Sequence, residues 1–130
     1  MKLIFVGERR SPRARSMGVR WQDGRLAAAT LFAALEACGI DPAACDYVNL
    51  FHQYGPKLPR AAVVMFLHRQ VRDGWVVVGL GRAVQRQLRA CQIPHLALVH
   101  PAARGAIRGK ACYQRHVAEV LGHLRGKEPR

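Results

Sequence analysis

Short, continuous apolar runs alternate with longer amphipathic segments along the chain. The first run, residues 3–6, has no polar member and stops at Gly7, which is typical of a strand buried inside a parallel sheet. Runs that are mostly apolar follow at residues 46–51, 75–78 and 95–99. Each of the four predicts a β-strand.

The amphipathic segments predict helices between and after these strands. In residues 25–37 the apolar positions Ala28, Leu31, Phe32 and Leu35 recur at the spacing of one helix face, and Gly39 is placed to end the helix. Pro59 and Gly74 are placed to begin and end a helix over residues 60–72. Apolar residues on one face predict helices over the segment after Gly81 and over residues 111–124. Residues 11–24 are polar and rich in arginine, proline and glycine, and they predict a long loop.

Strands that alternate with helices predict an α/β domain, because parallel strands need crossover connections that cover both faces of the sheet. We therefore expect a single domain over residues 1–130, a three-layer α/β/α sandwich around a four-stranded parallel sheet. Functional sites of such folds lie beyond the carboxyl ends of the strands. Four segments follow strands here: residues 7–9, 49–52, 79–81 and 100–102.

The charge balance points to an anionic partner. The formal net charge is +13, and 17 of the 21 basic residues are arginine. Arginine binds phosphate oxygens through two parallel hydrogen bonds, so this composition favours nucleic acid. A solvated basic surface, or a codon bias towards arginine, would give the same composition. The apolar runs are too short for a membrane span or for the core of a signal peptide, and we expect a cytoplasmic protein with no membrane partner.

The four cysteines do not predict a metal or redox site. They are Cys38, Cys45, Cys91 and Cys112, and no pair has the C-x-x-C spacing of a zinc knuckle or redox motif. We expect structural thiols, with no metal and no cofactor.

His100 is the strongest candidate for chemistry. It follows a predicted strand directly and precedes Pro101, which restricts the backbone at the edge of the sheet. The next residues, 102–110, are small and basic and lead into a helix whose N-terminus is suited to phosphate. A histidine beside a cationic loop is suited to binding DNA and acting on one nucleotide.

In these segments the sequence resembles the uracil-DNA glycosylase superfamily. That family carries His-Pro-Ser-Pro after its last strand, then a loop that inserts into DNA, then Arg-Gly and a helix; residues 100–103, Arg104 and Arg108-Gly109 stand in those places. Its first motif reads Gly-Glu-x-Pro-Gly in the most similar branch, and residues 7–12 keep Gly-Glu. Its second strand ends in an asparagine, as Asn49 does here, and the turn at residues 79–83 also resembles the family.

The resemblance implies a glycosylase that excises uracil or a related deaminated base by hydrolysing the N-glycosidic bond. Its partner would be DNA, single-stranded or uracil-containing, and it would act as a monomer. His100 would stabilise the charge that develops on the uracil oxygen. Glu8 would orient water or stabilise the sugar cation; the alternative for Glu8 is a salt bridge to a neighbouring arginine.

The resemblance also implies which residues bind the base and the backbone. Asn49 would contact the uracil edge, and Trp21 would stack on the flipped base. Phe51 is a second stacking candidate, with a place in the core as its alternative. The expected DNA contacts are Arg9, Arg10, Arg13, Arg104, Arg108 and Lys110, with Arg104 in the position of the wedge.

Several positions depart from the family pattern. Arg9 and Arg10 stand where other branches carry a water-positioning Asp or Asn, and Ala102-Ala103 replaces Ser-Pro. The branch with Gly-Glu usually holds an iron–sulfur cluster, which the cysteine spacing here does not support. A non-catalytic nucleic-acid-binding module that keeps the fold is therefore the alternative function.

A flavodoxin-type nucleotide-binding domain is a third candidate function, which the positive net charge disfavours. The glycines at 79 and 81 are explained by a phosphate-binding turn or by close packing of strand on helix.

Overall fold

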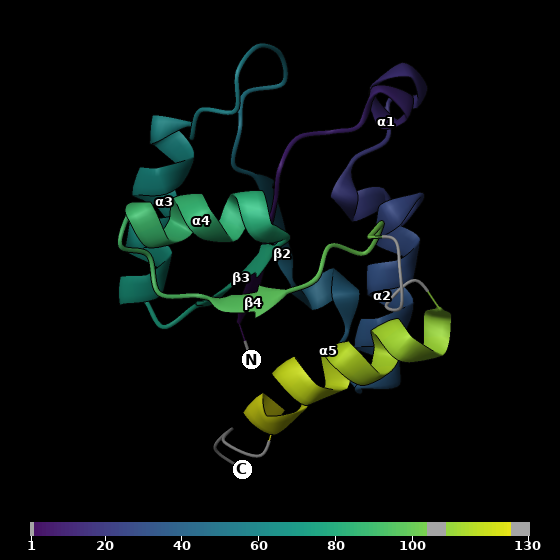
Figure 1. Cartoon of the computed structure of the whole chain (residues 1–130). Coiled ribbons are helices and arrows are strands. Elements are labelled where there is room, and N and C mark those ends of the chain that lie inside the picture. Colours follow the sequence, from purple (N-terminus) through teal and green to yellow (C-terminus); the bar gives the residue numbers. More distant parts are fainter. Residues whose placement is uncertain (1, 104–108, 126–130) are drawn as a thin grey trace.

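A four-stranded sheet forms the centre of the protein. The structure is a computed structural model that describes residues 2–103 and 109–125. All neighbouring strands run parallel, in the order β2-β1-β3-β4. The strands are β1 (Leu3–Gly7), β2 (Asp46–Asn49), β3 (Val76–Leu80) and β4 (Leu96–Leu98). The predicted parallel sheet is confirmed (Figure 1).

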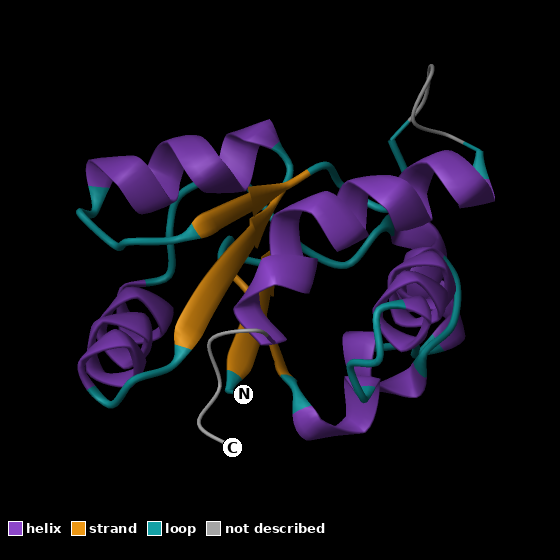
Figure 2. Ribbon diagram, turned by 90° about the horizontal axis from the view of Figure 1, so that it is seen from below, coloured by secondary structure: helices purple, strands orange, loops and turns teal. Residues whose placement is uncertain are grey.

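Helices cover both faces of this sheet. They are α1 (Pro12–Met17), α2 (Ala27–Ala37), α3 (Ala61–Arg72), α4 (Arg82–Ala90) and α5 (Lys110–Arg125), with short 3-10 turns η1 (Trp21–Asp23) and η2 (Pro42–Ala44). The helices α3 and α4 lie on one face and α2 and α5 on the other (Figure 2), which confirms the three-layer α/β/α sandwich. No helix in the described part of the chain is both long enough and apolar enough to span a bilayer.

Two apolar clusters hold the layers together, and β1 contributes to both. Leu3 and Phe5 pack under α2 and α5, whereas Ile4 and Val6 pack under α3 and α4. This alternation follows from the period of two along a strand. Because β1 is central and covered on both faces, all four side chains are fully buried, which explains its uninterrupted apolar run.

The strand order places a crevice between β1 and β3. From β1 the chain first builds β2 on one side of the sheet and then returns to build β3 and β4 on the other. The connections that follow the two strands run to opposite faces of the sheet at such a reversal, and ligands bind there in this class of fold. Glu8 follows β1 and Gly81 follows β3, and a carboxylate oxygen of Glu8 lies 4.0 Å from the position that a Cβ on Gly81 would take.

The predicted loop over residues 11–24 is wrong, because it contains a helix and a 3-10 turn. Ser11 caps α1 by accepting a hydrogen bond from the Ala14 N–H at 3.1 Å, and Pro12 takes the first helical position. Gly18, with φ of 67°, ends the helix. Ser, Pro and Gly are frequent in loops, but they also begin and end helices. Because this helix has only six residues, its start and stop residues dominate the segment, and the sequence resembles a loop.

Candidate functional site

His100 is held at the carboxyl end of β4 by a tight turn. Its carbonyl oxygen accepts a hydrogen bond from the Ala103 N–H at 2.9 Å, with Pro101 at the second position of the turn. Its ring Nδ1 accepts the Ala102 N–H at 3.0 Å. A neutral imidazole whose Nδ1 accepts carries its proton on Nε2. The turn therefore leaves an Nε2–H donor for a ligand.

Burial and one carboxylate act in opposite directions on His100. Loss of solvent lowers the pKa of this imidazole below its ordinary value of 6.5, and the negative charge of Glu8 partly offsets the shift. The ring is thus neutral at neutral pH, as the hydrogen bond to Nδ1 requires. The stability that the neutral ring contributes is present above pH 6.5 and is lost as the pH falls through the lower pKa of the folded state.

Trp21 joins the first two strands to His100. Its indole Nε1–H donates to the Asn49 Oδ1 at 2.9 Å, and its ring meets the His100 ring edge-on at 6.1 Å between centroids. Gly7 makes this possible, because a Cβ there would lie 2.8 Å from the indole. The structure therefore brings Trp21, Asn49 and His100 together. A ligand that reaches Asn49 would bind its amide nitrogen or compete with Trp21 for its oxygen.

Glu8 is paired with a lysine rather than with an arginine of its own segment. Lys57 Nζ lies 2.7 Å from Glu8 Oε2, in a pair that is partly exposed. The alternative of a salt bridge to a neighbouring arginine is therefore wrong about the partner: Glu8 is in an ion pair, but with a lysine 49 positions away in the chain. Solvent screening makes such a partly exposed pair weak.

An arginine-rich pocket lies on the Trp21 side of His100. It encloses about 400 Å³, and its wall contains five arginines together with Trp21, His100 and the backbone around α1. The arginines are Arg9, Arg10, Arg13, Arg20 and Arg25. The Nε of Arg9 is buried and has no hydrogen-bond partner within the described residues. A buried donor without an acceptor is uncommon, and an anionic oxygen would satisfy it.

A second hollow of about 670 Å³ lies on the other side of His100, towards Glu8 and Gly81. His116 lines it, and its Nε2 accepts the Val99 N–H at 2.9 Å, while the Tyr113 hydroxyl donates to the Val99 carbonyl at 2.7 Å. These two bonds from α5 fix the chain just before His100. Glu8 and His100 therefore share one hollow, and Asn49 joins them through Trp21.

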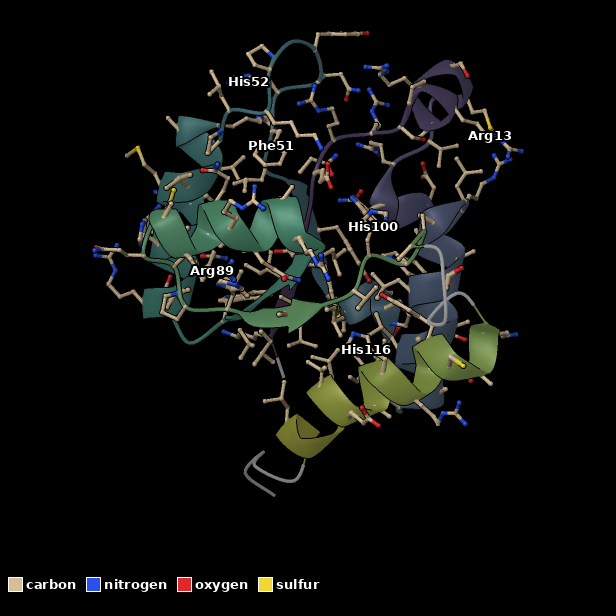
Figure 3. The ribbon with its side chains drawn as sticks, in the orientation of Figure 1. Arg13, Phe51, His52, Arg89, His100 and His116 are labelled. Atoms are coloured by element: carbon tan, nitrogen blue, oxygen red, sulfur yellow. The ribbon has the colours of Figure 1, made fainter. Side chains whose placement is uncertain are left out.

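Phe51 does not belong to the site. It is 2% exposed and packs in the cluster under α3 and α4, so the stacking interpretation is wrong and its core alternative is confirmed (Figure 3). A residue buried in that layer has no free face for a base. Its backbone pairs with Pro59 in an isolated bridge beyond β2, which explains its strand-like pattern.

The remaining predicted DNA contacts are only partly described. Arg13 is exposed on α1, and Lys110 is the exposed first residue of α5. Arg104 and Arg108 lie outside the described residues.

The glycines at 79 and 81 have separate roles. A Cβ on Gly79 would lie 3.0 Å from a methyl group of Leu88, which supports close packing of β3 on α4. Gly81 caps α4 with φ of 90°, a conformation that other residues rarely adopt.

The sequence did not indicate the contacts made by the loop that contains Lys57. Residues 52–58 connect β2 to α3, and three arginines from residues 9–15 bind this loop: Arg9 donates to the Gly55 carbonyl at 2.8 Å, and Arg10 and Arg15 bind Gln53. A loop rich in Gly and Pro that follows β2 was the only available signal, and it indicates a turn rather than these contacts.

No group of three or more His, Cys, Asp and Glu residues within residues 2–103 and 109–125 is placed to hold a metal ion. Comparison of the chain with models of known protein families and with curated protein sequences finds no match.

The opposing effects on His100 give a direct prediction. Replacing Glu8 with Gln removes the charge that raises the pKa of His100, so that pKa is expected to fall further below 6.5. Titration of the histidine ring resonances by NMR measures it. Glu36→Gln, on the exposed side of α2, is the control and should leave the titration unchanged. A rise in the His100 pKa in Glu8→Gln would show that the carboxylate does not act on this ring.

Proposed function

We propose that the protein binds DNA, accommodates one nucleotide turned out of the strand, and excises uracil or a related deaminated base by hydrolysing its N-glycosidic bond. The observation that carries the proposal is a neutral histidine, held with its proton on Nε2, in the wall of a pocket with five arginines. That combination matches the two parts of a nucleotide: a base with carbonyl oxygens and a phosphate.

The arginines account for affinity in this proposal. None of the residues lining the pocket is acidic, and Arg9, one of its five arginines, has a buried Nε without a partner among the described residues. Phosphate contacts supply most of the affinity of proteins for DNA and make it depend on salt. Turning a nucleotide out of the strand costs a few kcal/mol, which these contacts and stacking on Trp21 would offset.

His100 accounts for the chemical step. As the bond between the sugar C1′ and the base nitrogen breaks, its electron pair moves onto the base and towards the carbonyl oxygens. A hydrogen bond from Nε2–H to such an oxygen strengthens as that charge develops, so it stabilises the transition state more than the ground state. Water then adds to C1′, and the proton that it loses balances the charge of the departing base. Glu8 lines the second hollow, on the other side of His100 from the arginine pocket, and it is the acidic group that would orient the water across His100.

Uracil release is the test. The protein is incubated with an oligonucleotide that contains one uracil and then treated with alkali, which cleaves the strand at abasic sites. We expect cleavage at the uracil position and none in the matching thymine oligonucleotide. An intact uracil strand, with hypoxanthine and xanthine substrates also intact, would refute the enzymatic proposal.

A non-catalytic nucleic-acid-binding module is the second candidate, favoured by one observation. The carboxylate that would orient water is in an ion pair with Lys57 at 2.7 Å. A module of this kind would bind DNA with an affinity that falls steeply as salt rises, and would release no base. A binding titration over a range of salt, run beside the cleavage assay, distinguishes the two candidates.

A further inference from the structure

The loop that connects β2 to α3 is attached to the segment that forms the arginine pocket. Arg9 donates to the Gly55 carbonyl at 2.8 Å, and Arg15 donates to the Gln53 carbonyl at 3.0 Å. The Gln53 side chain exchanges two 3.3 Å hydrogen bonds with Arg10, one to its backbone carbonyl and one from its guanidinium. Figure 1 shows the loop and α1 rising on the same side of the sheet. They form one surface, not two independent loops.

Tyr54 stands at the tip of that loop with its side chain 75% exposed. The guanidinium carbon of Arg15 lies 4.9 Å from the centre of the Tyr54 ring, over one of its faces. The next residue, Gly55, has φ of 88°, and a Cβ there would meet nothing within 4 Å. One face of the ring is therefore covered by a cation, and the region around the tip is open to solvent.

Two features distinguish this arrangement from an isolated exposed aromatic side chain. The hydrogen bond from Arg15 to Gln53 holds the guanidinium in place over the ring. Arg10, bonded to Gln53 next to Tyr54, also lines the arginine pocket. Arg10 therefore links the pocket to the loop that carries Tyr54.

We infer that Tyr54, backed by Arg15, is a stacking platform for an unpaired base of single-stranded DNA, next to the nucleotide held in the pocket. The inference rests on the proposed function and specifies its substrate. A base can stack on a protein ring only where its own face is free, and in a duplex both faces are covered by neighbouring base pairs. Aromatic platforms lined by cations are the common means of holding single strands without regard to sequence. The excess positive charge around Tyr54 fits a polyanion.

The platform is tested with the full chain and fluorescently labelled oligonucleotides. Affinity for a single strand and for the matching duplex is measured by anisotropy for the wild type, Tyr54→Ala and Tyr54→Phe. We expect the wild type to prefer the single strand, Tyr54→Ala to lose about tenfold or more in that affinity, and Tyr54→Phe to retain it, because phenylalanine keeps the stacking face. Leu58→Ala is the matched control, since Leu58 is also exposed in this loop, at 59%, but offers no ring.

A fluorescent base analogue placed at successive positions beside the uracil gives a second readout. Stacking on Tyr54 should quench it at one neighbouring position, and the quenching should disappear in Tyr54→Ala. Unchanged single-strand affinity in Tyr54→Ala overturns the platform, and equal losses for single strand and duplex show that Tyr54 instead inserts into duplex DNA. In both cases uracil release by the wild type still decides the proposed function separately. Failure of the wild type to bind either form refutes the function and the platform together.

Discussion

Replacing His100 with alanine is expected to slow uracil release by about 10²-fold or more in single-turnover experiments. The substitution removes the Nε2–H that would face the developing negative charge on the base. Affinity for DNA should change little, because it comes mainly from the phosphate contacts of the arginines. His100→Gln places an amide donor in the same region and should restore part of the rate, which separates loss of the donor from collapse of the turn. His68→Ala, exposed on α3, is the control.

The outcome separates a catalytic from a structural role. His100 also joins the turn through its Nδ1 bond to Ala102, so its loss affects the local fold as well. Weaker binding with unchanged single-turnover chemistry would refute the catalytic assignment. If the wild type shows no activity on uracil, hypoxanthine or xanthine, His100 is a structural residue of a binding module.

The sheet and the approximate positions of its strands were predictable from sequence because they depend on local pattern. The strand ends were less accurate, since β2 stops at Asn49 rather than at Phe51 and β3 continues to Leu80 rather than stopping at Val78. Uninterrupted apolar runs mark strands covered on both faces, and β1 is buried along its length. Once the strands were located, the fold class itself placed Glu8 and His100 at one edge, without knowledge of any contact. The layers and the position of these two residues follow from periodicity and chain order alone.

The contacts that complete the site were not predictable, because they join segments far apart in the chain. Trp21 and Asn49 are 28 positions apart, and Arg10 and Gln53 are 43 positions apart. Neither pair follows a helix or strand period that a sequence pattern would reveal. The same holds for Lys57, whose pairing with Glu8 depends on how the loop before α3 folds back over the end of β1.

Phe51 was wrongly assigned to the site because its position at the end of a strand was given too much weight. It follows β2, so the edge rule placed it at the site, yet its side chain points into the layer under α3 and α4. The rule locates backbone, whereas the pleat decides which face a side chain takes. For α1, the helix is too short to show a periodic apolar face, and none of its residues is buried.

Replacing Gly7 with alanine is expected to displace the Trp21 ring and so disrupt the site. The added Cβ would lie 2.8 Å from the Trp21 ring, so the indole must move and its 2.9 Å bond to Asn49 lengthens or breaks. Overpacking of this kind costs about 1–3 kcal/mol of stability, and the displaced indole should also reduce uracil release by about tenfold. Thermal unfolding measures the loss of stability, and the cleavage assay measures uracil release. Tryptophan fluorescence reports the movement of the indole in a Trp75→Phe background, where Trp21 is the only tryptophan.

Gly122→Ala is the control, because a Cβ there meets nothing within 4 Å and alanine favours the helix. Unchanged emission and stability in Gly7→Ala would show that Trp21 does not rest on Gly7, and the geometry assigned to Asn49 and His100 would then be wrong.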